Sequence, residues 1–139
     1  MNAAEWKVTP SGHLVKLLSH TRNDRGMTLA GYTTRCLLRG EIHEIVTTDQ
    51  HGAVAGDRVD HVGFIGFAEL ERGGVVERGD LAVADGVPFG RVLGFDDCHF
   101  PNHLNLLVEA DRLLTAADIG APLGAEIRFE PQPNGPSPE

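Results

Sequence analysis

The eleven residues from Phe95 to Asn105, F-D-D-C-H-F-P-N-H-L-N, hold two Asp, one Cys, two His, two Asn and one Pro. Imidazole and carboxylate groups transfer protons near neutral pH, and both bind metals. The stretch lies between two apolar runs, Phe89–Phe95 and Leu104–Val108. We therefore expect it to connect two strands and to present its polar groups at their ends.

An acid–base interpretation makes His103 or His99 the group that moves a proton on a small substrate. Asp96 or Asp97 would then orient the imidazole, as carboxylates commonly do beside catalytic histidines. In this interpretation His103 is the general base, His99 is its partner and Asp96 is the orienting group.

The amides of Asn102 and Asn105 would contact the substrate and steady a developing oxyanion. A purely structural interpretation uses the same residues differently. Asp96 and Asn102 would then bond to nearby backbone in turns, and Pro101 would set its own φ.

A metal interpretation uses His99 and His103 as ligands, together with one carboxylate or with His61 from another strand. Zn or Fe is the metal that such a set would take. Pro101 between the two histidines disfavours a helix, so the stretch is not the helical His-x-x-x-His of a zinc protease. The three interpretations remain open at the level of the sequence.

A second candidate lies on the long run Arg58–Leu70, which is apolar on both alternating faces and is typical of a central strand. Either Asp60 or His61 must point inward there, and an inward polar group is paired or lines a cavity. We expect these two residues to contact a substrate. Gly63 and Gly66 would leave room for a ligand or a bend.

The nearly alternating run Glu41–Thr48 predicts a half-buried strand, and the same argument extends to its polar residues His43 and Glu44. The two cysteines are too few for a disulfide framework. Cys36 is expected in the core, and Cys98 is expected to be a half-buried side chain rather than a nucleophile.

Short β-branched or apolar runs separated by Gly and Asp dominate the chain and predict an all-β protein. We expect a small Greek-key β-barrel, closed or partly open, with at most one short helix at Thr115–Ile119. The strands are expected near 14–19, 32–38, 41–48, 58–70, 75–77, 81–84, 89–95, 104–109 and 126–130.

A Gly-Asp turn that begins a strand occurs twice, at Gly56-Asp57 and at Gly79-Asp80, 23 residues apart, with a looser copy at Gly124-Ala125. One domain is expected over 5–130. The tail 131–139 carries four Pro and is expected to be disordered.

The net charge of −8, with only 12 basic residues, disfavours nucleic acid and anionic membrane as partners. The chain shows no secretory signal and no apolar run of about 20 residues, so we expect a cytoplasmic protein. A small molecule is the expected partner, and a homo-oligomer is a further expectation because exposed strand edges often pair.

The second half of the chain, Arg58 to Glu130, resembles the glucitol/sorbitol-specific IIA component of the sugar phosphotransferase system. The resemblance follows Gly94-Phe95-Asp96, Phe100-Pro101-Asn102 and the last strand, and it implies a Greek-key barrel. Arg39 stands where that family has its phosphorylated His. The F-D-x-C-H-x-P-N-H-x-N segment also resembles an uncharacterised bacterial family.

These observations favour a small enzyme that acts on an organic metabolite by non-redox acid–base or metal-assisted chemistry, as a lyase, isomerase or cyclase. The chain has no dinucleotide fingerprint and no P-loop, which argues against NAD and ATP. The alternative is a non-catalytic metabolite-binding module or a regulatory module derived from the phosphotransferase component.

Overall fold

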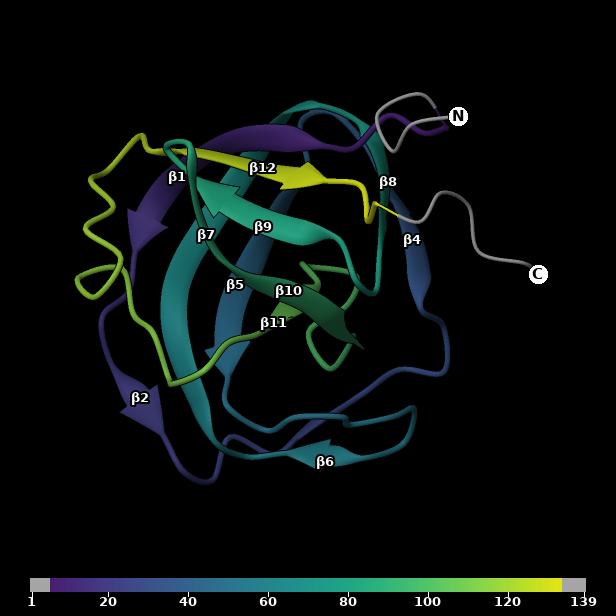
Figure 1. Ribbon diagram of the computed structural model, residues 1–139, viewed down its shortest axis with the longest axis vertical. Coiled ribbons are helices and arrows are strands. Elements are labelled where there is room, and N and C mark those ends of the chain that lie inside the picture. The colour runs from purple at the N-terminus through teal and green to yellow at the C-terminus, as the bar shows by residue number, and fades with distance from the viewer. Residues whose placement is uncertain (1–5, 134–139) are drawn as a thin grey trace.

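The computed structural model describes residues 6–133 and shows an all-β architecture (Figure 1). No helix occurs in this part of the chain. The strands are β1 (Ser11–Leu17), β2 (Thr21–Arg22), β3 (Met27–Thr28), β4 (Thr34–Leu37), β5 (Ile42–Thr48), β6 (Arg58–Val59), β7 (Val62–Arg72), β8 (Gly74–Glu77), β9 (Leu81–Ala84), β10 (Val87–Asp96), β11 (Asn105–Glu109) and β12 (Glu126–Glu130).

The expected strands overlap the observed ones, with two differences. The run expected as one strand over 58–70 is interrupted at Asp60 and His61, and it forms β6 and β7. The two-residue strands β2 and β3 were not predicted, since so short a pairing has no periodicity to read. The segment Thr115–Ile119 forms a turn instead of a helix, in which Asp118 Oδ2 accepts hydrogen bonds from the amide and the hydroxyl of Thr115.

Eight strands form one sheet in the order β1-β12-β9-β10-β11-β5-β7-β2. All neighbours in it are antiparallel except β11 and β5, which run parallel. Strand β7 also pairs with β1 along most of its length, so the circuit of pairings returns to its first strand. The pairs β3–β6 and β4–β8 form two small separate sheets. No helix in the described part has the length and apolar character needed to cross a membrane.

The predicted Gly turns precede β6, β9 and β12, and all three share one geometry. Their glycines have φ values of 88°, 96° and 86°. In each turn the amide after the glycine donates to the carbonyl three residues earlier, as in a type II turn with Gly at its third position. In two of the turns the carboxylate, from Asp57 or Asp80, also accepts the amide three residues before it. The interpretation of these pairs as strand-initiating turns is confirmed.

Both faces of the large sheet are covered by apolar clusters, because neighbouring residues of a strand point to opposite faces. Ile45 and Leu106 belong to one cluster, whereas the adjacent Val46 and Leu107 belong to the other. The second cluster is completed by side chains from β3, β6 and the segments beside them: Met27, Leu29, Ala53 and Val59. Cys36, expected in the core, is exposed, and its neighbour Leu37 is buried in its place.

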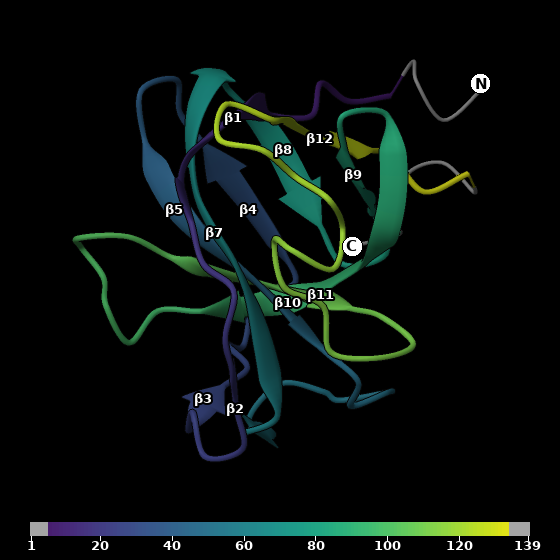
Figure 2. The ribbon, with the colours of Figure 1, turned by 90° about the vertical axis from the view of Figure 1, so that its left-hand side faces the viewer.

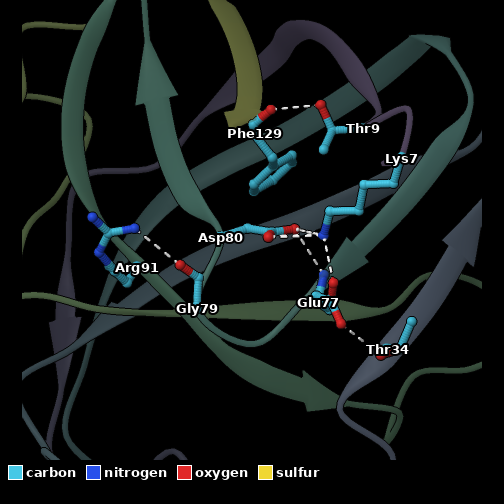
Figure 3. A network of polar contacts seen from close by, with 8 residues as sticks. All are labelled: Lys7, Thr9, Thr34, Glu77, Gly79, Asp80, Arg91 and Phe129. Carbon is cyan, nitrogen blue, oxygen red and sulfur yellow. Dashed lines mark hydrogen bonds and ion pairs between the residues drawn. The ribbon is translucent and has the colours of Figure 1, made fainter. Parts of the chain in front are cut away.

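A buried ion network fastens the N-terminal segment to the turn before β9 (Figure 3). Lys7 Nζ lies 2.6 and 2.8 Å from the two carboxylate oxygens of Asp80 and 3.0 Å from Glu77 Oε1. The side chains of Lys7 and Asp80 are 6% and 0% exposed. The hydroxyl of Thr9 then donates to the carbonyl of Phe129, which extends the attachment to β12.

Replacing Lys7 by Met should destabilise the protein by about 3–5 kcal/mol, because Asp80 would remain buried without its cation. Urea denaturation of the full chain measures this cost. Lys16→Met, at an exposed position of β1, is the matched control and should change stability little. Adding Asp80→Asn to Lys7→Met should recover part of the loss. A cost for Lys7→Met as small as that of Lys16→Met would contradict the assigned role.

The space beside Gly63 and Gly66 in β7, which was expected to admit a ligand or a bend, is occupied by the backbone of neighbouring segments. A Cβ at Gly63 would lie 2.5 Å from the carbonyl oxygen of Leu114, so the segment after β11 packs directly on this position. Gly66 has a φ of 147° and faces the carbonyl of Lys16 in β1 at a similarly close approach. The absence of a side chain at Gly63 and Gly66 therefore allows the Leu114 segment and β1 to pack closely against β7.

Gly63→Ala should cost about 1–3 kcal/mol or more, because the added methyl group forces the Leu114 backbone away from β7. Gly31→Ala is a suitable control, since nothing lies within 4 Å of its Cβ position and its φ is not in the left-handed region. Thermal and urea denaturation of both variants should show a large loss for the first and almost none for the second. Equal losses of stability in the two variants would show that the close contact between Gly63 and the Leu114 backbone does not contribute to stability.

The predicted tail begins at residue 131, and only 131–133 of it lie within the described residues. These three residues form neither strand nor helix. The remainder of the tail, and the prediction made for it, lie outside the part that the structure describes.

Candidate functional site

The candidate site is built on a row of four residues that pair side by side across four neighbouring strands. Phe67 of β7 pairs with Glu44 of β5, Glu44 with Asn105 of β11, and Asn105 with Asp96 of β10. Directly paired residues project from the same face of a sheet. Glu44 shares its face with Val46, so the row borders the second apolar cluster.

Two segments cover this row. One is the loop 97–104, which contains His99 and His103 and projects from one side of the molecule between β10 and β11 (Figure 2). The other is the chain around β3, which is attached to the end of β10. The amide of Thr28 donates to Asp96 Oδ2 at 2.8 Å, and the amide of Ala30 donates to the carbonyl of Phe95 at 2.8 Å.

Asp60 holds the start of the second segment. Its carboxylate accepts the amide of Gly26 at 2.8 Å, and its carbonyl accepts the amide of Arg25 at 3.1 Å. Arg58 Nε donates to the same carboxylate. Asp60 was expected to contact a substrate, but here it positions the backbone that carries Arg25.

Arg25 extends over the row to the loop histidines. Its Nη2 lies 2.9 Å from His99 Nε2 and 3.9 Å from Glu44 Oε1, and its side chain is only 14% exposed. An arginine always donates, so His99 Nε2 accepts this hydrogen bond and carries no proton in this arrangement. Arg25 therefore provides a fixed cation beside a buried carboxyl group and an exposed imidazole.

Glu44 is buried, with 6% of its surface exposed. Burial raises the pKa of this carboxyl group, and the nearby Arg25 and His99 oppose the rise only in part. Its Oε1 has no hydrogen-bond partner among the described residues. A carboxyl group in this environment holds its proton to a higher pH than an exposed glutamate does.

His103 lies in the same group. Its ring meets the edge of Phe67 at 5.1 Å between centroids and lies 5.0 Å from the ring of His99. Asn102 Nδ2 is 3.1 Å from His103 Nδ1, so Nδ1 accepts and Nε2 carries the proton of the neutral ring. Burial is the first cause that lowers the pKa of His103, and the nearby His99, His43 and Arg25 lower it further, because a protonated His103 would be repelled by their cationic forms.

Three buried polar atoms in this group have unused hydrogen-bonding capacity. They are Glu44 Oε1, His103 Nε2 and Asn105 Oδ1, and among the described residues Trp6 Nε1 is the one other buried side-chain atom without a partner. Buried polar groups are normally satisfied, so unpaired ones gathered in one place favour a binding site. We call Arg25, Glu44, His99, His103 and Asn105 the Glu44–His103 cluster.

Asp96 does not orient a histidine. Its carboxylate accepts the amides of Thr28 and Cys98 and the side-chain amide of Asn105 at 3.0 Å. Burial would raise its pKa, but the hydrogen bonds from Cys98, Thr28 and Asn105 outweigh it and lower the pKa. The expected role as orienting group is thus replaced by a structural one, in which Asp96 joins β10, β11 and the segment at Thr28.

His43 and Cys98 are also structural. His43 Nδ1 accepts the amide of Leu104 at 3.0 Å, and its Nε2 faces Glu41, which leaves a neutral, buried ring with a lowered pKa caused first by burial. Burial and the neighbouring Asp96 raise the pKa of the Cys98 thiol. Cys98, expected to be half-buried, is exposed, and its raised pKa makes the thiol a poor nucleophile.

The structure does not bring His61 to the loop histidines. His61 is exposed, its Nδ1 lies 3.4 Å from Asp49 Oδ1, and its carbonyl accepts a hydrogen bond from the hydroxyl of Thr48 at the far end of β5. Thr48 is four residues beyond Glu44, a separation of about 13 Å along a strand. His61 was expected to join the loop histidines from the central strand, but Glu44 of β5 lies beside this loop instead.

The described residues contain no group of three or more His, Cys, Asp and Glu side chains placed to hold one metal ion. His99 and His103 lie close together, but His61 is remote and Asp96 is engaged by backbone amides. The assignment of Zn or Fe to these two histidines stays a prediction.

Two residues of the cluster, Glu44 and Arg25, lie outside the loop and could not be predicted from the loop sequence. Glu44 was suggested by the apolar pattern of its strand, because a carboxylate in a buried run needs a reason to be there. Nothing in the local sequence indicates Arg25, since a charged residue in a Gly- and Asp-containing segment is normally solvated.

The chain belongs to DUF6917, a family of unknown function whose model matches residues 4–130. Neither the curated proteins nor the solved structures contain a match to it. The resemblance to the phosphotransferase component is not among these findings. The functional argument therefore depends on the geometry of the Glu44–His103 cluster.

Glu44→Gln should stabilise the protein at pH 8 and lose this advantage as the pH falls. Because the pKa of Glu44 is raised in the folded protein, the folded state binds this proton more tightly than the unfolded chain. Stability therefore decreases as the pH rises from the unfolded pKa of a glutamate, about 4.3, through the higher folded pKa.

Urea denaturation of Glu44→Gln and the parent chain between pH 4 and 8 measures this difference. Asp111→Asn, which removes an exposed carboxylate with no ion pair among the described residues, is the control and should show no such pH dependence. A pH-independent difference for Glu44→Gln would mean that Glu44 is not held in an unfavourable charged state.

Proposed function

We propose that this protein is a small cytoplasmic enzyme that acts on a small organic anion by non-redox acid–base chemistry of the lyase, isomerase or cyclase type. The observation that carries the proposal is the pairing of opposite pKa shifts in one cluster. The pKa of Glu44 is raised and that of His103 is lowered, with burial as the first cause in both. Such a pair supplies an acid and a base at the same pH.

The unpaired atoms define the roles. Glu44 Oε1 is the atom that exchanges a proton with the substrate, and His103 Nε2, which carries the proton of the neutral ring, donates a hydrogen bond to the substrate. Both atoms are buried, and the close partner of Glu44 Oε1 is Arg25, at 3.9 Å. Arg25 binds the anionic group of the substrate, as guanidinium groups bind carboxylate and phosphate. His99 lies on the exposed loop and positions Arg25 through their 2.9 Å contact.

Asn105 accepts a hydrogen bond instead of steadying an oxyanion. Its Nδ2 donates to Asp96, whereas its Oδ1 has no hydrogen bond of ordinary length in the described structure and interacts with the nearby His103. A substrate that carries a donor as well as an anionic group would fit this oxygen and Arg25. A small hydroxy acid, or the enol of an oxo acid, has both groups. Asn102, on the exposed side of the loop, acts on the substrate only through His103.

The alternative proposal is a metabolite-binding module in which the same cluster binds an anion without chemistry. We also propose that the closed circuit of pairings is a small Greek-key β-barrel, as the resemblance to the phosphotransferase component implies. Exposed apolar side chains at the β4–β5 turn, Leu38 and Ile42, support the proposal that copies of the chain associate.

Exchange of carbon-bound hydrogen in D2O tests the acid–base proposal. A panel of small hydroxy and oxo acids is incubated with the protein, and loss of proton signal next to the carboxylate is followed by NMR. Glu44→Gln and His103→Asn should each lower the exchange rate by about 10²–10⁴-fold, the usual contribution of a general acid or base. Arg25→Gln should mainly weaken binding of the anion.

His61→Asn is the matched control, since it removes an exposed histidine outside the cluster and should leave exchange unchanged. If acids bind with saturation but no hydrogen exchanges, the binding-module alternative is supported. If the exchange survives in both Glu44→Gln and His103→Asn, the proposed roles are wrong.

A further inference from the structure

A second site is suggested by an open cavity of about 920 Å³ on another part of the molecule. It lies between the β9–β10 hairpin and the chain that follows β11. Its contacts with β10 are at 87–92, near the start of that strand. Arg91 is five residues from Asp96, about 16 Å along a strand, so this cavity is distinct from the Glu44–His103 cluster. Ligand cavities commonly have volumes of about 300–1,000 Å³.

Three of the ten arginines in this acidic chain line the cavity: Arg78, Arg91 and Arg112. Arg78 and Arg91 each donate to one backbone carbonyl, those of Ala53 and Gly79. Within the described part of the chain none of the three forms an ion pair within 4.0 Å. Most of their donors therefore remain available to an anion.

Two of the three carboxylates that line the cavity form hydrogen bonds with other residues. Glu109 lies 2.7 Å from His51 Nδ1, and Asp118 accepts the amide and hydroxyl of Thr115. Arg112 lowers the pKa of Asp118 slightly in addition to those hydrogen bonds, but the two make no close contact. Asp111 is the third carboxylate and is exposed. None of these three carboxylates therefore forms a close ion pair with the arginines that line the cavity.

The cavity also has an apolar wall. Phe89, Leu114 and Ile119 line it and pack with their other sides against the first apolar cluster. Leu81 and the buried Val92 extend this wall. A fixed apolar surface next to free guanidinium groups suits a ligand with an aromatic or aliphatic body and an anionic end.

We propose that this cavity binds an amphipathic anion, with the carboxylate or phosphate at Arg91 and Arg112 and the apolar body against Phe89, Leu114 and Ile119. Arg78 is less exposed than these two arginines, donates to the carbonyl of Ala53 and gives a third charge contact. The site works independently of the proposed acid–base chemistry, because it shares no residue with the Glu44–His103 cluster.

Titration of the ¹⁵N-labelled full chain, followed by amide NMR, tests this site. The probes are phenyl phosphate and 3-phenylpropionate, with phenol and inorganic phosphate as half-probes. Saturable shifts are expected at 89–92 and 110–114. Both half-probes should bind about tenfold or more weakly, because each lacks either the charge-assisted hydrogen bonds or the apolar contact. The stronger of the two full probes identifies the anionic group.

Arg112→Gln and the double variant Arg91→Gln/Arg112→Gln should weaken binding of the better probe by about tenfold or more. Arg112 has no structural hydrogen bond among the described residues, so the single variant is expected to fold. Arg128→Gln removes a half-buried arginine outside the cavity, which is paired with Glu126 and Glu130, and this variant should bind as the parent does. Absence of saturable shifts at 89–92 and 110–114, or undiminished affinity of the double variant, would overturn the proposal.

Discussion

The arrangement of the candidate site depends on one buried carboxylate, Asp96, which lies at the end of β10 and must be satisfied by hydrogen bonds. Its oxygens accept the amide of Thr28, the amide of Cys98 and the side chain of Asn105. Because a buried charge without partners is costly, these three segments are held together at one point. The loop with the histidines, the first residue of β11 and the segment that delivers Arg25 therefore have fixed relative positions.

Around this satisfied carboxylate lies a group of residues that are not satisfied. Glu44, His103 and Asn105 each bury a polar atom that has no hydrogen bond of ordinary length in the described structure. Burial makes the charge of Glu44 unfavourable, although Arg25 lies 3.9 Å away. Stability alone would favour apolar residues at such positions, since most buried polar groups in proteins are paired. In this row Asp96 has all its hydrogen bonds within the protein and is structural, whereas the neighbouring Asn105 keeps one oxygen without a hydrogen bond of ordinary length.

The same strands carry two regions of different chemistry. The ends of β10 and β11 near Asp96 and Asn105 hold the Glu44–His103 cluster, and the opposite ends, near Arg91 and Glu109, border the arginine-lined cavity. The circuit of pairings from β1 to β7 and back to β1 makes this possible, because it fixes both ends of each strand at once. The Gly-Asp turns contribute by starting β6 and β9 with the same hydrogen bonds, and Asp80 adds the buried contact to Lys7 (Figure 3).

The sequence by itself determined the all-β class, the positions of most strands, the strand-initiating role of the Gly turns and the place of the loop with His99 and His103 between two strands. These are local properties, set by side-chain alternation and by the few residues that accept a positive φ. Only the tertiary structure decided that Glu44 and Arg25 join the loop, that Asp96 is structural, and that His61 lies at the other end of the sheet. Those outcomes follow from strand register and from which distant segments cover a face, and no local pattern encodes either.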